Sequence, residues 1–126
     1  MRAFFPGKYQ PPHLGHVLTI AKLYKKYNTI IIGINSDTHS IISKLEIKRI
    51  FKTIFPNIIV VYIPFKLTTL SKLDLSLVVP EFDILITAEN KEVYHWAKQQ
   101  NIKVKNIKRS KCIGCSGTEL RKLYGL

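Results

Sequence analysis

The chain is organised around residues 7–16, which read Gly7-Lys8-Tyr9-Gln10-Pro11-Pro12-His13-Leu14-Gly15-His16. The apolar run Ala3-Phe4-Phe5 before this stretch predicts a buried strand, and the apolar residues after it recur at helical spacing. The ten residues therefore predict a strand-to-helix turn that places two histidines in the first turn of a helix.

The two histidines, His13 and His16, are three residues apart, so their imidazoles are expected to project from one face of that helix. Gly15 between them removes a side chain where a ligand would approach the backbone. A helix start also gathers unpaired N–H groups and the positive end of the helix dipole, which favours anions. The stretch therefore predicts phosphate chemistry, whereas a His-x-x-His spacing by itself also occurs by chance on surface helices.

Apolar runs and helical patterns alternate along the whole chain. Strands are predicted near residues 3–5, 29–34, 58–63, 83–87 and 102–107, and helices at 13–27, 43–55, 71–79, 90–100 and from about 117. Continuous apolar runs are typical of strands buried on both faces of a parallel sheet, and the alternating run 102–107 predicts an edge strand. We expect an α/β fold: one domain, residues 1–126, with a Rossmann-like open parallel sheet of about five strands and helices on both faces.

The helix at residues 43–55 has a broad apolar pattern. Its residues expected to face the core are Leu45, Ile47, Ile50, Phe51 and Ile54. Polar segments follow three of the predicted strands, at residues 7–16, 35–40 and 88–90. Open parallel sheets bind ligands outside the carboxyl ends of their strands, so these segments are expected to meet in one site.

Charge and composition restrict the function without deciding it. The chain has 20 Lys plus Arg against 8 Asp plus Glu, a net charge of +12, and 46% apolar residues. Such an excess attracts phosphorylated molecules and nucleic acids alike. No membrane span or signal peptide is predicted, so we expect a cytoplasmic location and no membrane partner. Cys112 and Cys115 are interpreted as incidental loop thiols, because one pair cannot close a zinc site; a disulfide within the loop is the less favoured alternative.

The stretch 7–16 resembles the phosphate-binding signature of the nucleotidyltransferase superfamily, His-x-Gly-His. It is most similar to the pattern Gly-Arg-Phe-Gln-Pro-x-His-x-Gly-His of archaeal-type nicotinamide mononucleotide adenylyltransferases, which serve NAD biosynthesis. Lys8 stands where those enzymes usually carry Arg, so it can neutralise a phosphate without the bidentate fork of a guanidinium.

A second segment, Ser116-Gly117-Thr118-Glu119-Leu120-Arg121, has the spacing of a capping box and predicts a capped terminal helix. It also resembles the superfamily's second signature, Ser-Gly-Thr-x-x-Arg, whose helix start and Arg hold the β- and γ-phosphates of the nucleotide. Two further segments resemble the family more loosely. Arg49 fills the place of an Arg that contacts substrate or phosphate in the family, and the alternative is an ordinary surface Arg. Asn90 fills the place of a residue that contacts the nucleoside, and the alternative is a plain Asn near a helix start.

The resemblance implies nucleotidyl transfer from a nucleoside triphosphate to a phosphorylated small molecule. His13, His16, Lys8 and Arg121 would be catalytic, and the nucleotide would contact Gly7, Lys8, Tyr9, Gly15, His16, Asn90, Ser116, Gly117, Thr118 and Arg121. Mg²⁺ would be held mainly by the nucleotide phosphates, with no protein ligands. A homo-oligomer is also expected, with no state specified.

Two other functions stay open. The strand end Ile32-Gly33-Ile34-Asn35-Ser36-Asp37 resembles that of small cytidylyltransferases, which use CTP and a phospho-alcohol or phospho-sugar. The pair Gln10-Pro11 and the triplet Ser116-Gly117-Thr118 favour the adenylyl interpretation. A basic domain that binds nucleic acid on the same fold is the third and least favoured candidate. The sequence leaves the acceptor unidentified.

Overall fold

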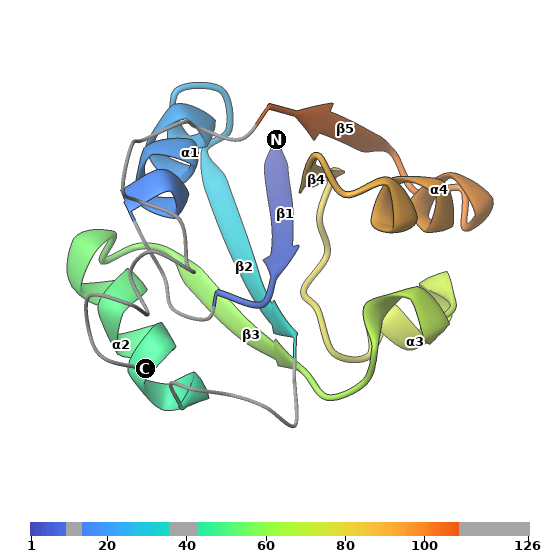
Figure 1. Ribbon diagram of the computed structural model, residues 1–126, viewed down its shortest axis with the longest axis horizontal. Coiled ribbons are helices and arrows are strands. Elements are labelled where there is room, and N and C mark those ends of the chain that lie inside the picture. Colours follow the sequence, from blue (N-terminus) through green and yellow to red (C-terminus); the bar gives the residue numbers. More distant parts are fainter. Residues whose placement is uncertain (10–13, 36–42, 109–126) are drawn as a thin grey trace.

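The computed structural model describes residues 1–9, 14–35 and 43–108. Strands and helices alternate along it, as the sequence predicts (Figure 1). The elements are β1 (Arg2–Gly7), α1 (Leu14–Tyr24), β2 (Thr29–Asn35), α2 (Lys44–Ile54), β3 (Ile59–Ile63), the 3₁₀ turn η1 (Leu67–Thr69), α3 (Lys72–Ser76), β4 (Ile84–Ala88), α4 (Lys91–Gln99) and β5 (Val104–Ile107). The helix expected from about residue 117 lies outside the described residues.

The strands form one sheet in the order β3-β2-β1-β4-β5, and every pairing is parallel. This confirms the predicted five-stranded parallel sheet, with β5 at an edge. The strand order reverses next to β1, since β2 and β3 lie on one side of it and β4 and β5 on the other. The carboxyl end of β1 is therefore the place where a ligand is expected.

Alternate residues of the strands build two separate cores. Phe5, Ile32 and Ile86 belong to the core under α1 and α2, whereas Phe4 and Leu85 belong to the core under η1, α3 and α4. Figure 1 shows α1 and α2 on one side of the sheet and α3 and α4 on the other. Both faces are covered, as predicted. None of the helices in the described ranges has the length and apolar character needed to span a membrane.

Short polar side chains set where the helices begin. Ser43 accepts the N–H of Glu46 at 3.2 Å at the start of α2, and Ser71 and Asp74 form a capping box at the start of α3. Helix α3 is shorter than the predicted 71–79 because the chain turns after Ser76 and continues toward Pro80.

The prediction for the apolar face of α2 was only partly right. Ile47 and Phe51 are fully buried, but Leu45, Ile50 and Ile54 are 61%, 37% and 45% exposed. Helix α2 connects β2 to the edge strand β3, so the sheet ends beneath it and covers only a narrow stripe of the helix. Residues four apart fill that stripe.

We expect Gly33→Ala to destabilise the fold, because a Cβ there would lie 2.5 Å from Cε1 of Phe4 and 2.9 Å from Cδ1 of Ile63. Both neighbours are fully buried, so the substitution should cost about 1–3 kcal/mol of unfolding free energy, measured by urea denaturation. In a Phe4→Leu background the same change should cost clearly less. An equal cost in both backgrounds would show that the clash with Phe4 is not the cause.

Candidate active site

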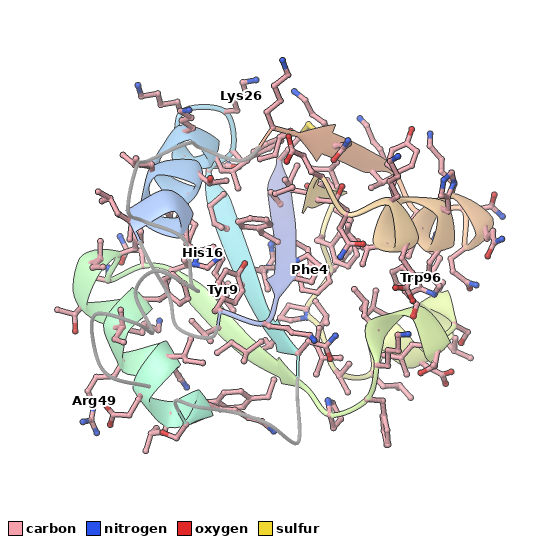
Figure 2. The ribbon with its side chains drawn as sticks, in the orientation of Figure 1. Phe4, Tyr9, His16, Lys26, Arg49 and Trp96 are labelled. Carbon is pink, nitrogen blue, oxygen red and sulfur yellow. The ribbon has the colours of Figure 1, made fainter. Side chains whose placement is uncertain are left out.

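The candidate site begins where β1 ends, at Gly7 in the middle strand of the sheet. Lys8 is exposed just beyond it, and α1 begins at Leu14, so His16 stands in the first turn of that helix. This confirms that a strand ends and a helix begins within residues 7–16, whereas residues 10–13 of the predicted turn lie outside the described residues. Figure 2 shows His16 and Tyr9 close together between α1 and α2.

Tyr9 supports this turn from within the core. Its backbone has a φ of 53°, its side chain is 3% exposed, and its hydroxyl donates a hydrogen bond to the carbonyl of Phe5 at 2.8 Å. Its ring meets the imidazole of His16 edge to face, with 4.8 Å between the ring centroids. Burial raises the pKa of Tyr9 well above its usual range, so the hydroxyl stays protonated and remains a donor. The predicted contact of Tyr9 with a nucleotide stays a prediction.

The first turn of α1 is suited to an anion. Gly15 is buried and adds no side chain of its own to this turn, and its carbonyl accepts the hydroxyl of Thr19 at 2.9 Å. The first N–H groups of a helix have no acceptor within the helix, and they carry its positive partial charge. His16 is half-buried and stands at this same turn. The arrangement can bind and stabilise negative charge next to an imidazole.

Asn106 holds the chain at the carboxyl end of β4, on the same edge of the sheet as Gly7. Asn106 on β5 accepts two hydrogen bonds with its side-chain oxygen, from the hydroxyl of Thr87 at 3.1 Å and from the N–H of Glu89 at 2.9 Å. These bonds hold the chain as it leaves β4, where Glu89 has a φ of 60°. The sequence analysis missed Asn106. A signal existed, because Asn106 breaks the alternation of apolar and polar residues in the run 102–107.

Asn90, the predicted nucleoside contact, caps α4. Its side-chain oxygen accepts the N–H of Val93 at 3.0 Å. This is the cap that its place before a helix favours, and its role toward a nucleoside stays a prediction. At the end of β2, the side-chain oxygen of Asn35 is buried and has no hydrogen-bond partner among the described residues. Such an unpaired oxygen is costly, and a donor on a bound molecule would satisfy it.

The other predicted site residues are not brought to His16 by the described structure. Arg49 lies on the outer side of α2, where its Nη1 is 3.0 Å from Oε1 of Glu46 and its side chain is 66% exposed. Figure 2 shows it away from His16. The remaining ones, His13, Ser116, Gly117, Thr118 and Arg121, lie outside the described residues, as do Cys112 and Cys115.

The described residues offer no metal centre of their own, since they contain no group of three His, Cys, Asp or Glu side chains that could hold an ion.

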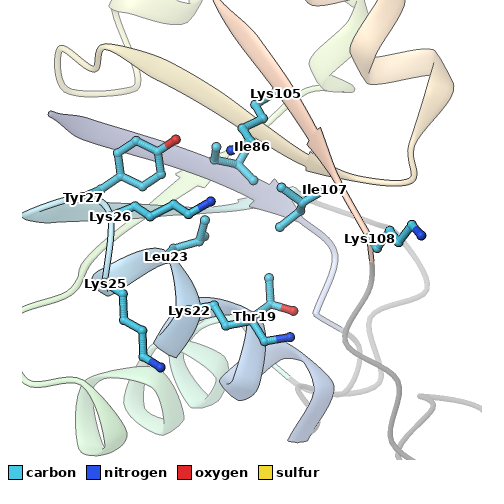
Figure 3. A pocket seen from close by; sticks show the side chains of 10 residues that line it. All are labelled: Thr19, Lys22, Leu23, Lys25, Lys26, Tyr27, Ile86, Lys105, Ile107 and Lys108. Carbon is cyan, nitrogen blue, oxygen red and sulfur yellow. The ribbon is translucent and has the colours of Figure 1, made fainter.

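A groove of about 270 Å³ lies beside α1, between this helix and β5 (Figure 3). Its described lining consists of Thr19, Lys22, Leu23, Lys25, Lys26, Tyr27, Ile86, Lys105, Ile107 and Lys108. These include five lysines and no carboxylate, so the groove would attract anions. It runs along a face of the sheet, whereas open parallel sheets bind ligands outside the carboxyl ends of their strands. We therefore place the candidate site at the strand ends.

We expect Asn106→Ala to loosen the turn after β4, because the N–H of Glu89 and the hydroxyl of Thr87 would lose their acceptor. Unfolding free energy should fall by about 1 kcal/mol, and the amide of Glu89 should exchange its hydrogen faster. Asn106→Asp keeps an acceptor and should preserve the slow exchange. Lys105→Ala, at the exposed neighbouring position, is the control, and equal exchange in both Ala variants would contradict this role of Asn106.

Known proteins resemble this chain in sequence and in fold. Residues 4–123 match the cytidylyltransferase-like family. A nicotinamide-nucleotide adenylyltransferase of Archaeoglobus fulgidus is 31% identical over 141 residues, and the match covers 97% of this chain and 79% of that protein. The enzyme of the same name from Sulfurisphaera tokodaii is 51% identical over 43 residues, which are 32% of this chain and only 25% of the relative.

The fold also resembles that of a solved bifunctional NMN adenylyltransferase/ADP ribose pyrophosphatase from Francisella tularensis. The TM-score is 0.74 at 14% identity, over 99% of this chain and 42% of that protein, so the present chain spans less than half of its length. A structure of the Francisella protein complexed with AMP and a manganese ion gives a TM-score of 0.72 at 13% identity, over 98% and 41% of the two chains. At these identities the likeness concerns the fold.

Proposed function

This chain belongs to the cytidylyltransferase-like family, and on that premise we propose that it transfers an adenylyl group from ATP to nicotinamide mononucleotide or a closely related phosphorylated acceptor. An oxygen of the acceptor phosphate attacks the α-phosphorus of ATP. The bond from this phosphorus to the oxygen that bridges the α- and β-phosphates breaks, and pyrophosphate leaves with the bonding electrons. Since no protein nucleophile is needed, positioning and charge stabilisation supply most of the acceleration.

The observation that carries this proposal is the place of His16. It stands in the first turn of α1, directly after the central strand β1 and beside the point where the strand order reverses. There its imidazole can donate a hydrogen bond to a phosphate oxygen while the helix start attracts the same charge. By the sequence resemblance, His13 would act beside it, Lys8 would neutralise a phosphate and Arg121 would neutralise the departing pyrophosphate.

Relatives named adenylyltransferases favour ATP over CTP. The cytidylyl alternative is retained as the second candidate because the matching family also carries the cytidylyltransferase name. We expect the triphosphate to arrive as its Mg²⁺ complex, a proposal that the manganese ion in the Francisella structure supports for divalent metals in general. The ion would then enter as part of the substrate.

The substrate proposal is tested by measuring pyrophosphate release with Mg²⁺, crossing ATP and CTP against phosphorylated acceptors that include nicotinamide mononucleotide. We expect release with ATP and that mononucleotide. Release only with CTP and a phospho-alcohol or phospho-sugar would support the cytidylyl alternative. If no pair gives release and the protein binds nucleic acid with an affinity that falls steeply as salt rises, the protein is a nucleic-acid-binding protein rather than a nucleotidyltransferase.

We expect His16→Ala to lower kcat by at least about a hundredfold, the scale of one lost donor to the transition state. The fold should remain intact, because His16 is only half-buried. His95→Ala is the matched control, since this exposed histidine lies on α4, on the other face of the sheet. An active His16→Ala enzyme, or an equal loss in both variants, would contradict the role of His16.

A further inference from the structure

We propose that Tyr9 is a positioning residue for His16: its buried ring holds the imidazole in the orientation that the transfer step needs. The inference rests on the proposed function for its catalytic consequence, but the contact itself can be tested without activity. It gives Tyr9 a role different from the nucleotide contact that the sequence resemblance implies, because a side chain that is 3% exposed has little surface to offer a ligand.

Three contacts fix the Tyr9 ring. Its hydroxyl donates to the carbonyl of Phe5 on β1 at 2.8 Å, and its ring packs edge to face on Phe5 at 6.0 Å and on Phe51 of α2 at 5.0 Å between centroids. The backbone contributes too, since the φ of 53° lies in a region that few side chains adopt. A strand, a turn and a helix thus determine the position of this ring together.

The fixed ring in turn limits the motion of His16. The two ring centroids are 4.8 Å apart and the planes meet at 69°, an edge-to-face arrangement that aromatic pairs prefer. A packed neighbour restricts the rotamers open to the imidazole and keeps one side of it away from water. This restriction should favour the transfer step, because a histidine displaced slightly from hydrogen-bond distance to the phosphate would lower the rate of the reaction.

Gly7 belongs to the same arrangement. A Cβ at Gly7 would lie 3.1 Å from Cε2 and Cζ of Tyr9, a distance tight enough to push the ring. The glycine that ends β1 therefore leaves the space that the Tyr9 ring needs. The hydroxyl adds the bond to the Phe5 carbonyl, which a phenylalanine at this position would lack.

The test is a double-mutant cycle between Tyr9 and His16. We expect Tyr9→Leu to lower kcat by about tenfold with little change in KM for ATP, since it disturbs an interaction used in the reacting state. In a His16→Ala background the same change should alter kcat less than about twofold, because the residue it positions is gone. Tyr9→Phe restores the ring and should recover most of kcat. An equal loss in both backgrounds would overturn the proposal.

Phe4→Leu is the matched control, because Phe4 is a fully buried aromatic residue of the core on the other face of the sheet, whereas Tyr9 belongs to the core under α1 and α2. It should lower the free energy of unfolding while kcat stays within about threefold of the wild type, which sets the scale of a merely structural effect. A loss of kcat in this variant as large as that in Tyr9→Leu would count against a specific role for Tyr9.

An NMR readout separates failure of this inference from failure of the proposed function. The ring of Tyr9 should shift the Hε1 resonance of His16, assigned by its absence in His16→Ala. The resonance should move in Tyr9→Leu and stay in Tyr9→Phe. If Tyr9→Leu does not fold, Gly7→Ala, which presses on the ring, should move it instead. An unmoved resonance would overturn the contact, whether or not the protein releases pyrophosphate.

Discussion

The burial of β1 between two neighbouring parallel strands is the constraint on which the rest of the structure depends. Its residues pair with β2 from Arg2 to Gly7 and with β4 at Ala3 and Phe4, and both of its faces are covered. Parallel strands need crossover connections, so each strand must leave the sheet at the same edge. Gly7, Asn35 and Ala88, the last residues of β1, β2 and β4, therefore lie along one edge of the sheet.

Much of this architecture could be predicted because burial on both faces leaves a strong pattern. The run 29–34 forms β2, which is buried on both faces as its continuous apolar pattern predicts. The similar run 58–63 contains the edge strand β3, where Tyr62 is 36% exposed, so the pattern alone does not tell an inner strand from an edge strand. The apolar face of α2 could not be predicted equally well. Spacing alone does not show that the sheet ends under the helix, so Leu45, Ile50 and Ile54 look like core residues in the sequence and are exposed in the structure.

Some features of the candidate site could likewise be predicted from the sequence, and others could not. The place of His16 and Gly15 followed from the strand-to-helix pattern, since the histidine stands in the first turn of α1. The contact between Tyr9 and His16 depends on a φ of 53°, which no periodicity reveals. Asn106 acts across two strands, and the pairing of Ala88 with Ile107 brings it to Glu89. These contacts depend on the register between distant strands and on unusual backbone angles, which the sequence pattern does not predict.

The most direct test of this account is a crystal structure with ATP and nicotinamide mononucleotide bound. We predict that an oxygen of the α- or β-phosphate lies within hydrogen-bond distance, about 3 Å, of the imidazole of His16, with the ring of Tyr9 still packed on that imidazole. A triphosphate bound instead among the lysines of the groove between α1 and β5, away from His16, would contradict the account.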